Sequence, residues 1–198
     1  SCAVSGGSST WTKGNRTITG TCSDTGSGCT GNISYTYSSD INTTTAGAGG
    51  NNIGGTVTDN AGNSTTCLAN QTVKVDKTNP TYTSFATSTT ANSGTLTITG
   101  GADSGSGIST YKYYLDGVLK GTTTSTSYTY TGLSSATNYT MSFEIVDNVG
   151  NIATSSKSVA TSINIPTSLV ATKGTTAQGR QITLNWNANG NTSNISYK

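Results

Sequence analysis

The chain has 198 residues, of which only 9% are charged and 31% are apolar, and its formal net charge at pH 7 is +2. Its ten basic residues are spread along the chain rather than gathered in a stripe, which argues against nucleic-acid binding. No apolar run is long enough to span a membrane, so we expect no membrane insertion. Abundant threonine, serine, glycine and asparagine, with ten tyrosines against two phenylalanines, predict an all-β fold with solvated faces.

One pair of short phrases occurs twice, and it organises the chain. Each copy contains an Asp-x-Gly-Ser-Gly phrase followed by an Asp-Asn-x-Gly-Asn phrase, and all four phrases follow strand-like runs. Aspartate, asparagine and glycine in this spacing favour tight turns. The repeat predicts two related β-sandwich modules in series. The phrases are Asp24 to Gly28 and Asp59 to Asn63 in the first copy, and Asp103 to Gly107 and Asp147 to Asn151 in the second.

The first module is expected over residues 1–79. Alternating apolar and polar residues predict strands at 2–5, 16–22, 33–37, 53–59 and 65–76. In the run 33–37 the side chains of Ile33, Tyr35 and Tyr37 share one face. The glycine- and asparagine-rich stretch 43–55 is expected to be a loop.

Four cysteines lie in this first module, and their even number predicts two disulfides and an oxidising compartment. Zinc is the alternative, but the chain has no histidine, and Cys22 and Cys29 are too far apart for a Cys-x-x-Cys motif. Four cysteines allow three pairings. We favour Cys22–Cys29, which closes the loop after a strand, and Cys2–Cys67, on the expectation that the first strand runs beside the last.

The second module is expected over residues 80–163, after a linker that ends at Pro80. Strands are predicted at 95–99, with Leu96 and Ile98 inward, and at 111–115, followed by a hairpin turn at Asp116 and Gly117. A further strand is expected to direct three apolar residues of one parity into the core. These are Met141, Phe143 and Ile145.

The spacing of Leu133 and Tyr139 before this alternating strand resembles the tyrosine corner of fibronectin type III domains. The doubled aspartate phrases, with the linker 75–80 between them, resemble tandem bacterial Ig-like repeats of large surface proteins. The second strand of this module lacks the tryptophan that is usual in fibronectin type III domains. The resemblance implies tandem Ig-like and fibronectin type III-like β-sandwiches, arranged as beads on a string, in an extracellular stalk, adhesin or accessory module. Phage virion proteins also carry such domains.

Residues 164–198 are similar to the opening strands of a further fibronectin type III domain, and here the strand tryptophan, Trp186, is present. An incomplete sandwich exposes strand edges and apolar surface. We therefore expect that either the parent chain continues past Lys198 or another chain donates strands.

The aspartates that open the four phrases are the candidate ligands for a metal. These are Asp24, Asp59, Asp103 and Asp147. If the two loops of a module lie at the same end of its sandwich, their oxygens suit Ca²⁺. The alternative is turn chemistry alone, because aspartate and asparagine cap turns, and each expected site has only two carboxylates where Ca²⁺ takes six to eight oxygens.

The inventory of reactive groups argues against an enzyme. Without histidine, neither a Ser-His-Asp nor a Cys-His arrangement is available. Glu144 is the only glutamate, and its parity turns it away from the predicted core. Lys74 and Lys112 lie on predicted strands, but alternation turns both toward water, which argues against a self-made Lys–Asn isopeptide bond.

The sequence thus predicts a non-catalytic structural or spacer segment of a modular extracellular surface or appendage protein. The alternatives are an adhesin or carbohydrate-binding module that uses exposed aromatic side chains, and accessory domains of an extracellular glycan-degrading enzyme. The expected partners are neighbouring domains of the same chain, then glycans, host-surface proteins or further copies of the chain.

Overall fold

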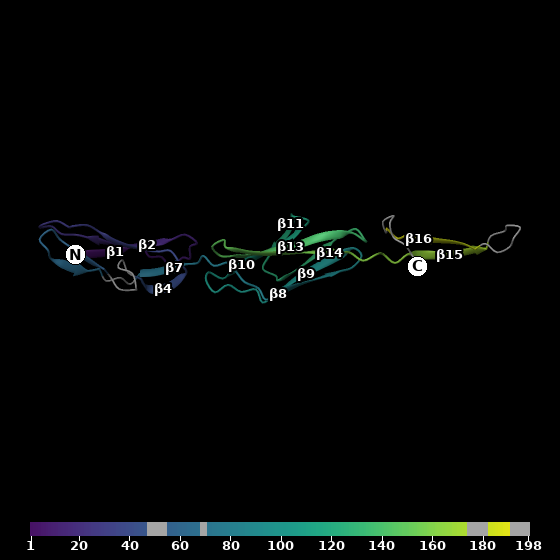
Figure 1. The fold of residues 1–198 in the computed structure, drawn as a ribbon, viewed down its shortest axis with the longest axis horizontal. Helices are drawn as coiled ribbons and strands as arrows, with labels where there is room; N and C mark the ends of the chain where they lie inside the picture. Colours follow the sequence, from purple (N-terminus) through teal and green to yellow (C-terminus); the bar gives the residue numbers. More distant parts are fainter. Residues whose placement is uncertain (47–54, 68–70, 174–181, 191–198) are drawn as a thin grey trace. The chain divides into compact units, whose positions relative to one another are not determined.

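The computed structural model describes residues 1–46, 55–67, 71–173 and 182–190 (Figure 1). Every regular element in this part of the chain is a β-strand, so the fold is all-β, as the composition predicts. None of the described residues forms a helix that could cross a membrane. Parts of the predicted loop 43–55 and of the predicted tail 164–198 lie outside the described residues.

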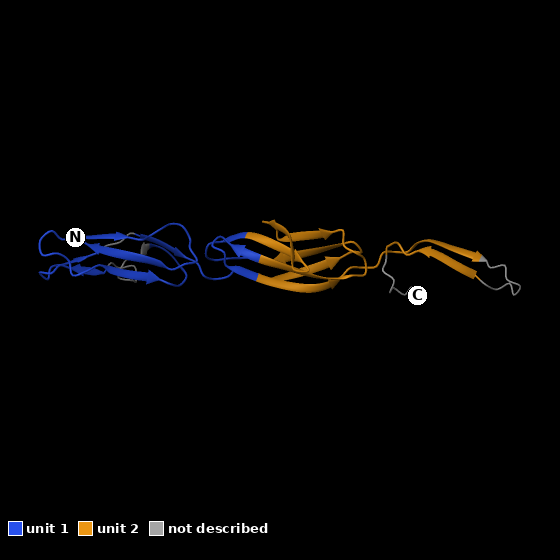
Figure 2. Cartoon of the chain, turned by 90° about the horizontal axis from the view of Figure 1, so that it is seen from above, with its two compact units in different colours: residues 1–81, 101–109, 145–153 blue, residues 82–100, 110–144, 154–198 orange. Residues whose placement is uncertain are grey.

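The chain forms two compact units, which are coloured separately in Figure 2. Unit 1 comprises residues 1–81, 101–109 and 145–153, and unit 2 comprises residues 82–100, 110–144 and 154–198. Each unit is therefore built of segments that are far apart in the sequence. The predicted module boundaries at 79 and 163 stay predictions.

The first half of the chain contributes seven short strands. They are β1 (Cys2–Ser5), β2 (Arg16–Cys22), β3 (Ile33–Tyr37), β4 (Ile41–Ala46), β5 (Thr56–Thr58), β6 (Ser64–Thr66) and β7 (Gln71–Val75). They form a three-stranded sheet in the order β1-β2-β3 and two-stranded sheets β4-β7 and β5-β6, all with antiparallel pairing. The prediction of a loop from residue 43 is wrong for residues 43–46, because β4 pairs there with β7.

A small apolar core lies between these strands of unit 1. Ile18, Tyr37, Val73 and Val75 are buried in it, and the partly buried Val4, Ile33 and Ile41 pack against them. Tyr35 shares a strand face with Tyr37 but is 43% exposed. Its ring packs edge-on against that of Tyr37, with centroids 4.7 Å apart.

The later strands are longer. They are β8 (Ser84–Thr89), β9 (Ser93–Thr99), β10 (Ile108–Leu115), β11 (Val118–Thr123), β12 (Ser127–Thr131), β13 (Asn138–Asp147), β14 (Ile152–Ala160), β15 (Thr167–Lys173) and β16 (Ile182–Asn187). Their sheets have the orders β11-β10-β13-β14, β12-β9-β8 and β15-β16. Asp116 and Gly117 both have positive φ and form the turn between β10 and β11, which confirms the predicted hairpin.

The core of unit 2 is aromatic. Phe143 is fully buried, and its ring lies 5.2 Å from the ring centroids of both Tyr82 and Phe85 in edge-on contacts. Leu96 and Ile98 of β9 are buried, as their alternation predicts. The three residues of β13 that were predicted to point inward are all 0% exposed: Met141, Phe143 and Ile145. Ile145 lies in the part of β13 that belongs to unit 1. The side-chain period of a strand thus identified the buried positions here.

The strand pair β15-β16 differs from the rest because its apolar side chains are exposed. Leu169 and Val170 on β15 are 69% and 55% exposed, and Ile182 and Trp186 on β16 are 67% and 46% exposed. A two-stranded ribbon has no second layer of its own to bury these groups. The expectation that residues 164–198 expose apolar surface is therefore met in the described part of that segment.

Candidate functional site in the repeated aspartate loops

The structure contains two disulfides, Cys2–Cys67 and Cys22–Cys29, which are the pairs that the sequence favours. β1 pairs with β2, which places Cys2 opposite Cys22, and hydrogen bonds from the Gln71 side chain to the Val4 carbonyl and from the Ser8 N–H to the Thr72 carbonyl also link β1 and the residues after it to β7. Cys67 follows β6, so its bond links two different sheets of unit 1. The side chains of both bonded cysteines, Cys2 and Cys67, pack against Gly20, where a Cβ atom would lie 2.9 Å from the Cys67 sulfur.

In the first copy of the repeat the two aspartates fold their own loops. The Asp24 Oδ2 accepts hydrogen bonds from the Gly28 N–H at 2.9 Å and from the Gly26 N–H and the Ser27 hydroxyl. The Asp59 Oδ1 accepts from the N–H groups of Ala61 and Asn63. The Asn63 side-chain amide bonds the Asp59 Oδ2 at 2.8 Å, and together with the Asn63 backbone N–H it lowers the pKa of Asp59.

The two loops of each copy lie against one another, joined by the asparagine of the second phrase. The Asn60 N–H donates to the Gly28 carbonyl at 2.8 Å, and the Asn148 N–H donates to the Gly107 carbonyl at 3.0 Å. Their side chains make equivalent bonds in the two copies. The Asn60 amide donates to the Ser27 carbonyl, and the Asn148 amide donates to the Ser106 carbonyl, both at 2.8 Å. Each copy of the repeated phrases therefore forms the same arrangement, in which hydrogen bonds from an asparagine link two neighbouring loops.

Glycine is required at matching places of the two copies. Gly28 and Gly107 have φ values of +78° and +84°, and Gly62 and Gly150 have values of +90° and +87°. A residue with a Cβ atom is strained in this left-handed region. The glycine spacing that made the repeat visible in the sequence thus follows from backbone geometry.

In the second copy Asp147 repeats the contacts of Asp59. Its Oδ1 accepts from the N–H groups of Val149 and Asn151, and its Oδ2 accepts from the Asn151 side-chain amide at 2.7 Å. Both Asp147 and Asn151 are buried, with exposures of 2% and 0%. Asp103 differs from its counterpart Asp24, because its Oδ2 accepts from the Gly107 N–H at 2.6 Å while its Oδ1 is buried without a hydrogen-bond partner.

A third carboxylate, Asp76, joins the second copy, although no sequence pattern marks it as a ligand. Its Oδ2 accepts from the Ser106 N–H at 2.6 Å, and its backbone carbonyl accepts from the Asn151 amide at 3.2 Å. Gly105 permits this approach, since a Cβ atom there would lie 2.4 Å from the carboxyl carbon of Asp76. Asp76 belongs to the segment 75–80 that we interpreted as a linker, and its position 27 residues before Asp103 gave no local signal.

Asp76, Asp103 and Asp147 bring one carboxylate oxygen each to within 4.8 Å of one another. Like charges at that distance repel by about 3 kcal/mol for each pair at an effective dielectric constant of about 20. The ion pair found among the described residues joins Lys112 and Glu144. Within that part of the chain, no lysine or arginine nitrogen therefore lies within 4.0 Å of the three carboxylates. The backbone N–H donors offset part of this repulsion, and a bound cation is the other means of offsetting it.

The predicted pair Asp24 and Asp59 lines a hollow of about 100 Å³ with Asn63 and Ser1. Asp24 is exposed, and the one three-acid group found among the described residues does not include either aspartate. The four predicted ligands are thus not equivalent. The structure brings Asp103 and Asp147 together with Asp76, whereas Asp24 and Asp59 have the contacts of turn residues.

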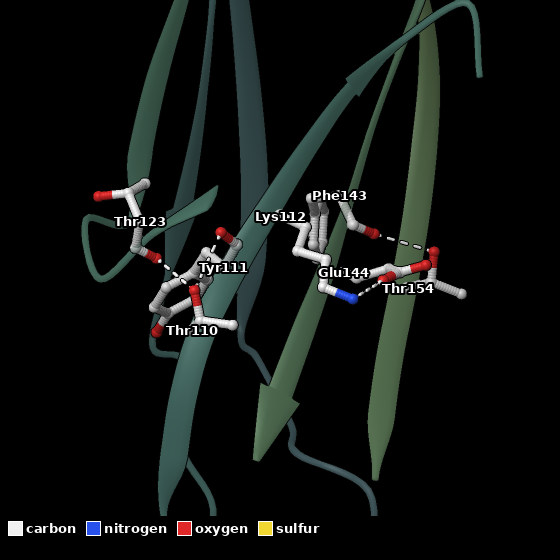
Figure 3. Close-up of polar contacts among 7 residues, drawn as sticks. All are labelled: Thr110, Tyr111, Lys112, Thr123, Phe143, Glu144 and Thr154. Atoms are coloured by element: carbon white, nitrogen blue, oxygen red, sulfur yellow. Dashed lines mark hydrogen bonds and ion pairs between the residues drawn. The ribbon is translucent and has the colours of Figure 1, made fainter. Parts of the chain in front are cut away.

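Lys112 and Glu144 face each other across neighbouring strands β10 and β13, with the Lys112 Nζ 3.3 Å from the Glu144 Oε2 (Figure 3). Both side chains are about one-third exposed, so the pair lies on the outer face of the sheet, as their parity predicts. Burial, and to a smaller extent Glu144, raises the pKa of Tyr114 beside this pair. The Nζ of Lys74 lies 5.6 Å from the ring centroid of Trp11, a cation–π contact.

The predicted tyrosine corner has a local counterpart in unit 2. The Tyr139 hydroxyl accepts a hydrogen bond from the Ser134 N–H, five residues upstream, at 3.0 Å. Leu133 is buried, and its N–H donates to the Asn92 carbonyl. The contact fastens the segment before β13.

Tyrosines also line a hollow of about 350 Å³ in unit 2, which includes Tyr128, Tyr130 and Tyr139. The ring of Tyr128 stacks on that of Tyr113 with centroids 5.2 Å apart. Burial, with a contribution from Tyr128, raises the pKa of Tyr130 to about 12. Burial also raises the pKa of Tyr113, whose hydroxyl donates to the Ser125 carbonyl.

Comparison of the chain with models of known protein families finds no family that matches, and comparison with curated proteins finds no relative. In its described residues the chain is an all-β protein with two disulfides and a cluster of three aspartates.

Proposed function

We propose that the chain is a structural spacer segment of a modular extracellular surface or appendage protein, built of tandem Ig-like and fibronectin type III-like sandwiches. The observation that carries this proposal is the Cys2–Cys67 disulfide, which joins residues 65 apart in sequence. Tension applied along the chain passes through this bond and bypasses the residues that it encloses. A segment that keeps its length under load is what a spacer requires.

The chemistry of the repeated loops supports the same proposal. The aspartate oxygens that the sequence offers as ligands accept hydrogen bonds from their own loops, and the asparagines fasten one loop to the next. Such loops maintain the strand ends in one arrangement. Two disulfides also favour an oxidising, extracellular compartment.

Single-molecule pulling from the two chain ends tests the mechanical part of the proposal. In non-reducing buffer the residues enclosed by Cys2–Cys67 do not extend, so the final contour length is shorter than in reducing buffer. Each extended residue adds up to about 3.6 Å, so the expected difference is about 200 Å. Equal contour lengths in the two buffers would show that the bond does not carry the load.

A binding screen tests the spacer role against recognition. The labelled chain is presented to glycan arrays, bacterial cells and mucins, with and without Ca²⁺. A spacer gives no saturable binding on any of these surfaces. Reproducible, saturable binding would refute the spacer role for this segment.

The tyrosine-lined hollow of unit 2 favours a second candidate function, carbohydrate recognition by an adhesin or accessory module. Aromatic rings beside hydroxyl and carbonyl groups suit a sugar face. In that case Tyr128→Ala removes glycan binding, whereas Tyr35→Ala, which truncates an exposed ring of unit 1, leaves it unchanged. If both variants bind as the parent chain does, the hollow is not the recognition site.

A further inference from the structure

We propose that Asp76, Asp103 and Asp147 bind one Ca²⁺ ion within unit 1. Each aspartate comes from a different one of the three segments that make up this unit, residues 1–81, 101–109 and 145–153. An ion held by all three fastens these segments together. This site differs from the two-carboxylate sites that the sequence suggests, because its third ligand lies outside the repeated phrases.

The spacing of the carboxylates fits one ion. The three oxygens lie within 4.8 Å of one another. Ca²⁺ binds oxygen at about 2.3–2.6 Å, so two oxygens on opposite sides of one ion are about 5 Å apart. The spacing of the three carboxylates is therefore that of ligands of one shared Ca²⁺.

Buried polar atoms without partners around the cluster point independently to a ligand. Asn151 is fully buried, and its amide nitrogen donates to the Asp147 carboxylate and the Asp76 carbonyl, yet its Oδ1 has no hydrogen-bond partner. The Asp103 Oδ1 and the Ser106 Oγ are likewise buried without partners. Buried polar atoms in proteins are nearly always paired, so the three oxygens on Asp103, Ser106 and Asn151 are available to bind a cation or water.

The first copy of the repeat serves as an internal comparison. It has the same Asp-x-Gly-Ser-Gly phrase, but there the serine hydroxyl donates to the aspartate, as Ser27 does to Asp24. In the second copy the equivalent Ser106 hydroxyl has no partner, and Asp76 lies beside the loop instead. The two copies differ at the atoms expected to bind the ion, although they share the Asp-x-Gly-Ser-Gly pattern.

The remaining ligands are supplied by neighbouring oxygens and water. Asp76 and Gly105 line a hollow of about 210 Å³, so the Asp76 side of the cluster borders space that water can enter. Three carboxylates, uncharged oxygens and water are the hard ligands that Ca²⁺ takes. The flexible coordination of Ca²⁺ suits a mixed set of this kind better than the near-ideal octahedron that Mg²⁺ demands.

Calcium titration of the whole chain after EDTA treatment tests the proposal. Isothermal titration calorimetry with CaCl₂ is expected to detect one site, and thermal unfolding in CaCl₂ at a hundredfold excess over the Kd is expected to raise the Tm by about 5 °C or more relative to EDTA. MgCl₂ at the same concentration gives a smaller rise. No heat and no Tm shift with CaCl₂, or an equal shift with MgCl₂, overturns the assignment to Ca²⁺.

Asp103→Asn is the decisive variant, because the asparagine keeps one oxygen for the Gly107 N–H while one carboxylate charge is lost. We expect it to abolish the CaCl₂ response and to leave the Tm in EDTA equal to or above that of the parent chain, since fewer like charges remain. Asp24→Asn, in the matching loop of the first copy, keeps the full response. If Asp103→Asn retains the CaCl₂ shift, or Asp24→Asn loses it, the proposed site is wrong.

Asp76→Asn provides a second test in case Asp103→Asn does not fold. Asp76 lies outside the repeated phrases, so a role in turn formation alone predicts no effect of its charge on the CaCl₂ response. Loss of that response, with an unchanged circular dichroism spectrum, supports the site, and retention of the response overturns it.

Discussion

Removal of the Cys2–Cys67 disulfide is expected to destabilise the protein much more than removal of Cys22–Cys29. In the chain-entropy model the stabilisation by a disulfide grows with the logarithm of the loop that it closes. The sequence separations are 65 and 7 residues. These loops correspond to about 4 kcal/mol and about 2 kcal/mol of unfolding free energy, a difference of about 2 kcal/mol.

Packing adds to this difference in the same direction. Cys67 is 0% exposed, and its sulfur and that of Cys2 pack against Gly20. Truncation to alanine therefore leaves a small void there, whereas Cys22 and Cys29 are only partly buried. We expect Cys2→Ala/Cys67→Ala to lose at least about 4 kcal/mol, and Cys22→Ala/Cys29→Ala to lose about 2 kcal/mol.

Urea unfolding followed by Trp11 fluorescence measures these losses. Trp11 lies in unit 1 beside β7, and a Trp186→Phe background removes the signal of the other tryptophan. The two double variants are compared at equal protein concentration, with their m-values measured separately so that a change in unfolded-state compactness is recognised. An equal loss in both variants, or a larger loss without Cys22–Cys29, would refute the loop-closure argument.

Three further predictions concern unit 2. Phe143→Ala is expected to lower the free energy of unfolding by about 3–5 kcal/mol, because it empties the centre of the aromatic core. Val118→Ala, at a position that is 57% exposed, is expected to change it by less than about 0.5 kcal/mol. Similar losses for the two variants in urea unfolding would contradict the assigned core. In the folded chain the pKa of Tyr130 is about 12, against an ordinary value of 10.0, so the unfolded chain releases this proton at lower pH. The contribution of Tyr130 to the free energy of unfolding is therefore constant below about pH 10 and falls between about pH 10 and 12. A smaller alkaline fall in Tyr130→Phe checks this, and an unchanged fall would contradict it. Tyr139→Phe removes the hydroxyl that accepts from the Ser134 N–H, and it is expected to lower the free energy of unfolding, measured in urea, by about 1 kcal/mol. An unchanged free energy would show that this hydrogen bond does not stabilise the protein.

Much of the local structure was predictable because it depends on neighbours in the sequence. Alternation located strands such as β2, β3 and β9 and the inward residues Leu96, Met141 and Phe143, since side chains of a strand point to opposite faces in turn. The predicted strand 65–76 is instead divided between β6 and β7, which belong to different sheets. The Asp116-Gly117 pair specified its hairpin through positive φ. The favoured cysteine pairs are those of the structure.

The parity of a strand does not state whether a second layer covers its face. Tyr35 and Tyr37 share a face, yet Tyr35 is 43% exposed and Tyr37 is 7% exposed. Residues 43–46 read Thr-Thr-Thr-Ala, which favours a strand, but they precede a glycine- and asparagine-rich stretch and were predicted with it as a loop. Their pairing with β7 corrects that boundary.

The sequence by itself determined the all-β class, the repeated turns and the four cysteines that could pair, because each depends on residue type and short spacing. Only the tertiary structure decided that Asp76 lies beside Asp103 and Asp147, since these residues come from three separated segments of unit 1. The distance between residues that are far apart in the chain is set by packing and by loops such as that of Gly105, not by a periodic pattern. The candidate calcium site is therefore visible only in the folded chain.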